Sequence, residues 1–229
     1  MTGLTDEQCR PSCGCGGETW NAPSWDAARI AALRVWTLEN VPELLSSDPY
    51  AADVPEVPND SVCAVLITNA ATHSYRLETF ATESDALGAG GIVTHKGVCG
   101  MCSALADLAV YAETLDLTTP VRQCGIDHAD LAGDIACLRA LQFTEPCAQI
   151  WAYNTQHTRQ ECASICLPLL TAPYHDADGT LNACLQCDED QSGPVFKAVA
   201  GRTRRNTGIA SALCRPCNEV VRLSHDYGE

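Results

Sequence analysis

The sequence predicts an α+β protein in which a small antiparallel sheet packs with several disulfide-linked helices. Strand-like apolar runs gather before residue 96, whereas amphipathic helical patterns dominate from residue 102 onward. Fifteen of the 229 residues are cysteine, and their mixture of isolated residues and close pairs is typical of a disulfide framework. Hydrophobic residues make up 46% of the chain, which is enough to build a buried core.

Composition divides the chain into two parts. Residues 1–24 are rich in Cys, Gly and Pro and are predicted to form an N-terminal arm, whereas residues 25–229 are predicted to form a single disulfide-rich domain. The arm has neither a basic n-region nor an apolar h-region, so no signal peptide is expected in the sequence as given. We therefore expect a mature secreted form or, alternatively, a cytoplasmic protein.

The first element of the domain is predicted to be a helix that begins at about residue 25. Ser24 is a candidate N-cap, and Ile30 and Leu33 recur at helical spacing. Pro42 is expected to break or bend this helix. Residues 46–60 are rich in Pro and Asp and are predicted to form a linker.

Three strands follow the linker. The apolar run at residues 61–70 predicts a buried strand, and the alternating pattern at residues 73–82 predicts a half-exposed one. The connection between them is short, so we expect a hairpin. A glycine turn at residues 88–91 leads into a short strand that ends at His95.

The second half of the chain is predicted to be mostly helical. Helical periodicity is present at residues 102–115, 127–143 and 145–170. Residues 171–194 are predicted to form a loop because they are polar and contain Gly and Pro, and residues 212–227 are predicted to form a terminal helix.

The formal net charge of −15 argues against a polyanionic partner. Nucleic acids and anionic membranes would be repelled, and no apolar run is long enough for membrane insertion. The single concentration of basic residues consists of Arg202, Arg204 and Arg205. It predicts a site for one small anionic ligand, the alternative being a set of surface ion pairs.

Most cysteines are predicted to form disulfides. Cys162 and Cys166 lie four residues apart in one predicted helix, so we expect each to bond to a neighbouring element. Because fifteen is an odd number, at least one thiol is left over: a buried Cys63, a reactive Cys102, or a cysteine that links two copies of the chain into a homo-oligomer. The cysteines predicted to be bridged are Cys9, Cys13, Cys15, Cys99, Cys124, Cys137, Cys147, Cys162, Cys166, Cys184, Cys187, Cys214 and Cys217.

Two CxxC pairs offer a metal-binding alternative. Cys184 and Cys187 form one pair, Cys214 and Cys217 form the other, and four such thiolates are the ligands of a tetrahedral zinc site. If these residues form disulfides instead, no cofactor is expected.

The stretch THKGVCGMCSALADLAVY, residues 94–111, is the best candidate for chemistry. Cys102 is predicted to stand at a helix N-terminus, where the helix dipole favours a thiolate, and His95 precedes it by seven residues. A thiol enzyme that uses Cys102 with His95 is therefore one functional hypothesis. The alternative is that Cys99 and Cys102 are each bridged to a different element, with Cys99 bonded to a cysteine distant in sequence.

The segment KGVCGMCSAL within this stretch is similar to the active-site segment of papain-like cysteine proteases. The similarity implies a bridged Cys99 and a nucleophilic Cys102. The segment departs from that family at Lys96, where the family has a glutamine, and at Ser103, where it has an aromatic residue. No later His–Asn segment accompanies it.

Over its length the sequence also resembles cysteine-rich proteins of algae and protists that have no assigned activity. The stretches that carry this resemblance are THKGVCGMCSALADLAVY, CDEDQSGPVFKAVAGRTRRNTGI and the closing HDY. The resemblance implies an extracellular protein and no particular mechanism. Asn59 begins an N-glycosylation sequon, which fits a secretory route.

Our leading hypothesis is a secreted, disulfide-stabilised protein with an extracellular binding or structural role. The thiol enzyme is the second hypothesis, and an intracellular zinc-binding protein is the third.

Overall fold

The computed structural model describes residues 13–15, 18–20, 23–176, 179–213, 215 and 219–228. β1 (Cys13–Cys15) and β2 (Glu18–Trp20) pair antiparallel within the predicted N-terminal arm. The predicted bridges of Cys9, Cys13, Cys15, Cys214 and Cys217 lie outside the residues or side chains that the structure describes.

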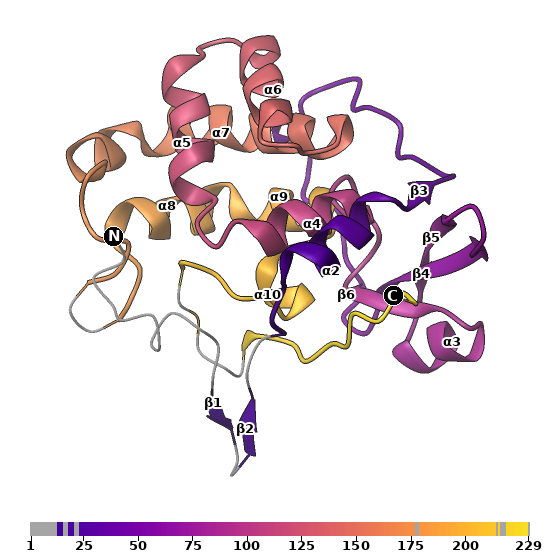
Figure 1. The fold of residues 1–229 in the computed structure, drawn as a ribbon. Helices are drawn as coiled ribbons and strands as arrows, with labels where there is room; N and C mark the ends of the chain where they lie inside the picture. The colour runs from indigo at the N-terminus through magenta and orange to yellow at the C-terminus, as the bar shows by residue number, and fades with distance from the viewer. Residues whose placement is uncertain are drawn as a thin grey trace.

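A four-stranded sheet forms one side of the domain (Figure 1). β4 (Val62–Asn69) is its centre and pairs antiparallel with both β5 (Ser74–Phe80) and β6 (Ile92–Lys96). β3 (Thr37–Leu38) adds a short parallel edge to β5. The predicted hairpin and third strand are therefore confirmed, and the parallel β3 is the one departure from an antiparallel sheet.

The two faces of β4 serve two different cores because successive side chains of a strand point in opposite directions. Cys63 and Val65 are fully buried in the main core, against α2 and α4. Val62 and Ala64 face the opposite side, where Leu223 of the C-terminal segment covers them. The apolar run of β4 is thus explained by a strand that is buried on both faces.

Helices cover the main face of the sheet and extend away from it (Figure 1). α2 and α4 lie beside the sheet, and α5, α6 and α7 form an outer layer above them, with α8 and α9 between. None of the described helices is long and apolar enough to cross a membrane. The described helices are α2 (Ala27–Arg34), α3 (Glu83–Gly88), α4 (Leu105–Glu113), α5 (Thr118–Asp127), α6 (Leu131–Ala140), α7 (Glu145–Cys166), α8 (Ala183–Gln191), α9 (Gly193–Ala200) and α10 (Arg204–Thr207), with short 3-10 turns at η1 (Pro49–Ala51) and η2 (Leu167–Leu169).

The predicted α+β class is confirmed, whereas several boundaries are wrong. Asp26, not Ser24, caps α2, since its carboxylate accepts the Arg29 backbone N–H. The predicted loop at residues 171–194 contains α8 and the start of α9. The described part of residues 212–227 contains no α-helix, so the predicted terminal helix is wrong there.

Among the described residues, ten cysteines form five disulfides, and each joins segments that are separate in the sequence. Cys63 is bridged to Cys99, so the expectation of a free Cys63 is wrong. Cys63 lies opposite His95 in the β4–β6 register. The turn after β6 places Cys99 next to Cys63. The remaining bridges are Cys102–Cys147, Cys124–Cys137, Cys162–Cys187 and Cys166–Cys184.

Candidate functional site: an apolar cavity among the helices

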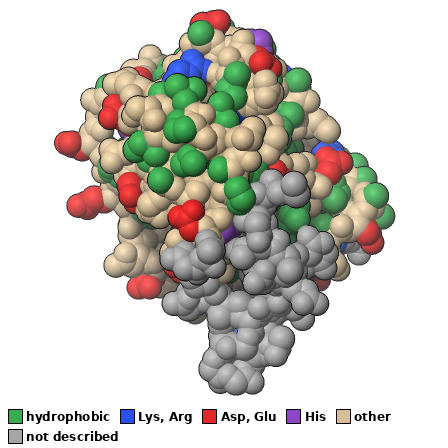
Figure 2. Space-filling model, turned by 90° about the vertical axis from the view of Figure 1, so that its left-hand side faces the viewer, with side chains coloured by type: hydrophobic (Ala, Val, Ile, Leu, Met, Phe, Trp, Pro, Cys, Tyr) green, Lys and Arg blue, Asp and Glu red, His purple; other side chains and the backbone are tan. Residues whose placement is uncertain are grey.

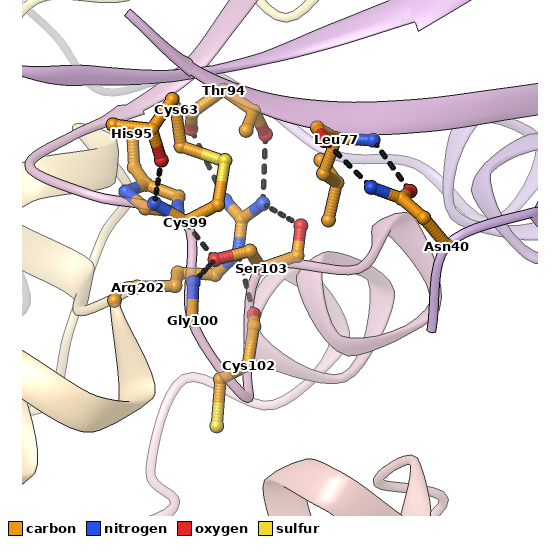
Figure 3. The surroundings of a disulfide bond; sticks show 12 residues. Asn40, Cys63, Leu77, Thr94, His95, Cys99, Gly100, Cys102, Ser103 and Arg202 are labelled. Atoms are coloured by element: carbon orange, nitrogen blue, oxygen red, sulfur yellow. Dashed lines mark hydrogen bonds between the residues drawn. A yellow bond between two sulfur atoms is a disulfide. The ribbon is translucent and has the colours of Figure 1, made fainter. Parts of the chain in front are cut away.

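The predicted thiol pair is not assembled in the structure. Cys102 is fully buried and bonded to Cys147 at the start of α7, so it has no thiol to ionise. Its sulfur points away from His95 (Figure 3). A thiol-dependent enzyme that uses Cys102 with His95 is therefore contradicted by this disulfide.

His95 instead belongs to a buried hydrogen-bonded cluster. Its Nε2 lies 2.7 Å from the Ser103 hydroxyl, and its Nδ1 lies 2.9 Å from the Lys96 carbonyl. The Ser103 hydroxyl also accepts the Gly100 backbone N–H (Figure 3). Burial lowers the pKa of His95 to about 3, which keeps the imidazole neutral. Since His95 and Ser103 have no exposed surface, this pair stabilises the turn between β6 and α4.

Arg202 is the centre of the same cluster and is fully buried. Its guanidinium donates to the carbonyls of Cys102 and Ser103 and to the carbonyl and hydroxyl of Thr94 (Figure 3). A longer contact reaches the Thr207 hydroxyl. With its five N–H groups occupied by the protein, Arg202 has none left for a ligand. The predicted three-arginine anion site is thus wrong for Arg202.

The predicted zinc cysteines are used in a different way. Cys184 and Cys187 are bridged to Cys166 and Cys162, so they are not available as thiolates. Within the described ranges, no group of three or more His, Cys, Asp or Glu side chains is placed to hold a metal ion.

The described residues surround an apolar cavity of about 630 Å³, which lies among the helices. This volume is typical of small-molecule sites, which fall at roughly 300–1,000 Å³. Five segments contribute its apolar wall: the start of α5, then α7, α8, α9 and the segment after α10. The principal apolar side chains are Leu117, Val121, Trp151, Leu185, Phe196 and Ile209.

The mouth of the cavity is also apolar. Leu115, Ile126, Leu167 and Leu170 line it and are between 37% and 66% exposed. Figure 2 shows the face on which α5, α7 and α8 lie, and hydrophobic side chains gather across it. Exposed apolar side chains cost free energy in water, and a cluster of them is typical of a binding surface.

Disulfides hold the helices around this cavity. Cys162–Cys187 and Cys166–Cys184 both join α7 to α8, and Cys166 and Cys184 themselves line the wall. This double connection holds α7 and α8 side by side, so the part of the wall that they form has a fixed geometry.

One side of the cavity carries charge. The Glu189 carboxylate pairs with Lys197 at 2.9 Å, with Arg205 at 2.8 Å, and with Arg215. Burial would raise the pKa of Glu189, but the three cations together outweigh the effect of burial and lower the pKa.

Arg204, which also lines the cavity, donates to the carbonyls of Tyr111, Ala210 and Thr114. Burial lowers the pKa of Arg204 to about 10, so it stays charged at neutral pH.

The sequence singled out Arg204 and Arg205, and the structure places both in the wall of the cavity. The sequence did not indicate that apolar residues lie beside these two arginines. Leu117 and Ile209 are 92 positions apart, and no local pattern links them. The available signals were two helix starts in this region: Asn182 caps α8, and Pro194 stands at the second position of α9.

Fold and cavity together define a disulfide-stabilised α+β protein with an apolar ligand-sized cavity. Residues 132–223, less than half of the chain, match the model of a family described as a family of unknown function (DUF8771). The matched part runs from α6 to the C-terminal segment and includes the disulfide-linked α7 and α8. The comparisons found no matching curated protein and no matching solved structure.

Proposed function

We propose that this protein is an extracellular binding protein that holds an apolar small molecule in the cavity among α5, α7, α8 and α9. The observation that carries the proposal is the apolar cavity of about 630 Å³ with an exposed apolar mouth. A ligand that fills it would remove the mouth residues from water, and each buried methylene contributes about 0.8 kcal/mol.

The disulfides support the extracellular part of the proposal. The five described bridges are typical of a protein from an oxidising compartment, because reducing compartments keep thiols free. The sequon at Asn59 lies in an exposed turn, which is where a glycosylated asparagine is expected. Mass analysis after secretion from eukaryotic cells tests this modification directly.

The binding test uses N-phenyl-1-naphthylamine, a neutral apolar dye that fluoresces when it leaves water. We expect saturable binding with a dissociation constant on the order of 1–10 μM, which corresponds to roughly 7–8 kcal/mol. The variant Ala163→Trp adds an indole to the cavity wall and should weaken binding at least tenfold. Ala132→Trp is the matched control, because Ala132 is an exposed helical alanine on α6.

Equal binding by both tryptophan variants would show that the dye sits elsewhere. Absence of saturable binding by the oxidised wild-type protein would overturn the proposed function.

A further inference from the structure

We infer that the natural ligand is an amphipathic anion, a long-chain carboxylate, whose head group binds to Arg122 at the mouth of the cavity. This inference rests on the proposed function and specifies the chemistry of its ligand. The apolar tail would extend toward Phe196 and Ile209, which are buried at 8% and 2% exposure.

The distribution of charge is the first observation. The chain has 14 Lys and Arg against 29 Asp and Glu, yet six of those 14 basic residues line this one cavity. Two acidic residues, Asp188 and Glu189, are among its described lining. A cleft with low-dielectric walls concentrates the field of such an excess and attracts anions that the rest of the surface repels. The basic residues of the described lining are Arg122, Arg159, Lys197, Arg204, Arg205 and Arg215.

The donors of Arg122 are the second observation. Arg122 lies on α5, is half-buried, and donates one hydrogen bond, a 3.3 Å contact with the Leu170 carbonyl. No described carboxylate lies within ion-pair distance of it. The Asp116 carboxylate is occupied by the hydroxyls of Thr119 and Tyr174. Most of the five N–H groups of Arg122 are therefore free to bind a carboxylate in the bidentate geometry that suits guanidinium.

The position of Arg122 relative to the apolar mouth is the third observation. Leu170, whose carbonyl it contacts, is a mouth residue, and Ile126 follows Arg122 by one turn of α5. Arg159 of α7 adds a second charge nearby, since its Nη2 lies 3.7 Å from where a Cβ on Gly125 would be. Cations beside apolar side chains at the entrance match a molecule that is charged at one end and apolar along its length.

The other cavity cations are less suited to this role. Glu189 already neutralises part of the charge of Lys197, Arg205 and Arg215. Arg204 uses its guanidinium to hold three backbone carbonyls. Arg122 is therefore the cation that the structure leaves best placed for a head group.

The test compares dodecanoate with 1-dodecanol by isothermal titration calorimetry on the oxidised full chain. The two ligands share an apolar tail and differ in charge. We expect dodecanoate to bind at least tenfold more tightly than 1-dodecanol. Equal affinities for the two would overturn the carboxylate inference while leaving the proposed function intact, whereas binding of neither would overturn both.

Substitution of the arginine gives the second arm. Arg122→Gln should weaken dodecanoate binding about tenfold and leave 1-dodecanol binding unchanged, and Arg122→Lys should restore part of the loss. Arg139→Gln on α6 is the matched control, because Arg139 is an exposed arginine outside the cavity lining. An Arg122→Gln variant that melts like the wild type and binds dodecanoate equally well would contradict the inference.

Discussion

Arg202 shows how a single side chain joins three parts of this molecule. Its hydrogen bonds reach Thr94 on β6, the turn before α4 and, through Thr207, α10. Burial lowers its pKa, but the arginine remains charged at any physiological pH because an arginine starts from such a high value. Removing it leaves several buried carbonyls without a donor, which is among the more costly changes in a protein core.

Arg202→Met should therefore lower the free energy of unfolding by about 3–5 kcal/mol. Arg205→Gln is the comparison, because Arg205 forms partly exposed ion pairs with Glu189 and Glu219. Arg205→Gln should lower the free energy of unfolding by about 0–1 kcal/mol. Urea denaturation of the two variants measures both values, and equal small losses would show that the buried cluster is not a structural centre.

Asp107 gives a prediction about pH. It is fully buried on α4 and accepts hydrogen bonds from the Thr144 backbone N–H and hydroxyl, both at 2.8 Å. Burial raises its pKa from 3.8 to about 7, and the bonds from Thr144 only partly oppose this. Between pH 3.8 and about pH 7, Asp107 is protonated in the folded protein and ionised in the unfolded chain.

The native state therefore binds more protons in this window, and the contribution of Asp107 to stability falls as the pH rises from about 4 to about 7. Asp107→Asn has the same shape and does not titrate. Relative to this variant, the wild type should lose on the order of 3 kcal/mol of stability across the window. Unfolding free energies measured at several pH values test this, and two parallel pH profiles would contradict it.

At the scale of elements, the pair α7 and α8 is the most strongly constrained part of the described chain. Cys166–Cys184 spans 18 positions, and Cys162–Cys187 spans 25 and encloses it. Once one bridge is closed, the other closes only a short additional loop, so it removes little further entropy from the unfolded chain.

Replacing either cysteine pair alone with serine should therefore cost less than the usual 2–4 kcal/mol of a single disulfide. Removing both disulfides should lower the free energy of unfolding by more than the sum of the two separate decreases. A double-mutant cycle in guanidinium measures this coupling. Strict additivity would mean that the bridges act through local packing rather than through chain entropy.

Local patterns were sufficient to predict β4, β5, β6 and the long α7. These elements have strong periodicity because each buries a defined face, and α7 also begins at a recognisable Thr144 cap followed by Pro146. The same reasoning failed at α8, whose sequence ACLQCDEDQ is polar. That helix is held by two disulfides and packing against α7, which are tertiary constraints that no single segment displays.

The candidate site was less predictable than the fold. Arg204 and Arg205 stood out because the chain has few basic residues, and both line the cavity. Arg202, two positions earlier, looked the same in sequence and is instead a core residue. Cys102 looked reactive because it precedes a helix, but its reactivity depends on a partner, Cys147, that is 45 positions away.

At the scale of the whole molecule, we predict that ligand binding depends on the oxidised disulfide framework. Reduction should remove the constraints on α7 and α8, allow the apolar wall to collapse, and abolish binding of N-phenyl-1-naphthylamine. Alkylation of the native protein before reduction should label none of the ten cysteines in the described bridges. Mass spectrometry of the peptides checks this, and full dye binding by the reduced protein would contradict the structural role of the disulfides.

The most direct test of the central claim is to locate a ligand by methyl NMR with a doxyl-labelled stearate. The nitroxide broadens the signals of nearby methyl groups. We predict that it broadens those of Leu117, Val121, Leu185 and Ile209 in the cavity wall and spares Val62 and Val93, which lie in the separate core on the other face of the sheet. Broadening confined to the sheet, or spread evenly over the protein, would contradict a ligand site among the helices.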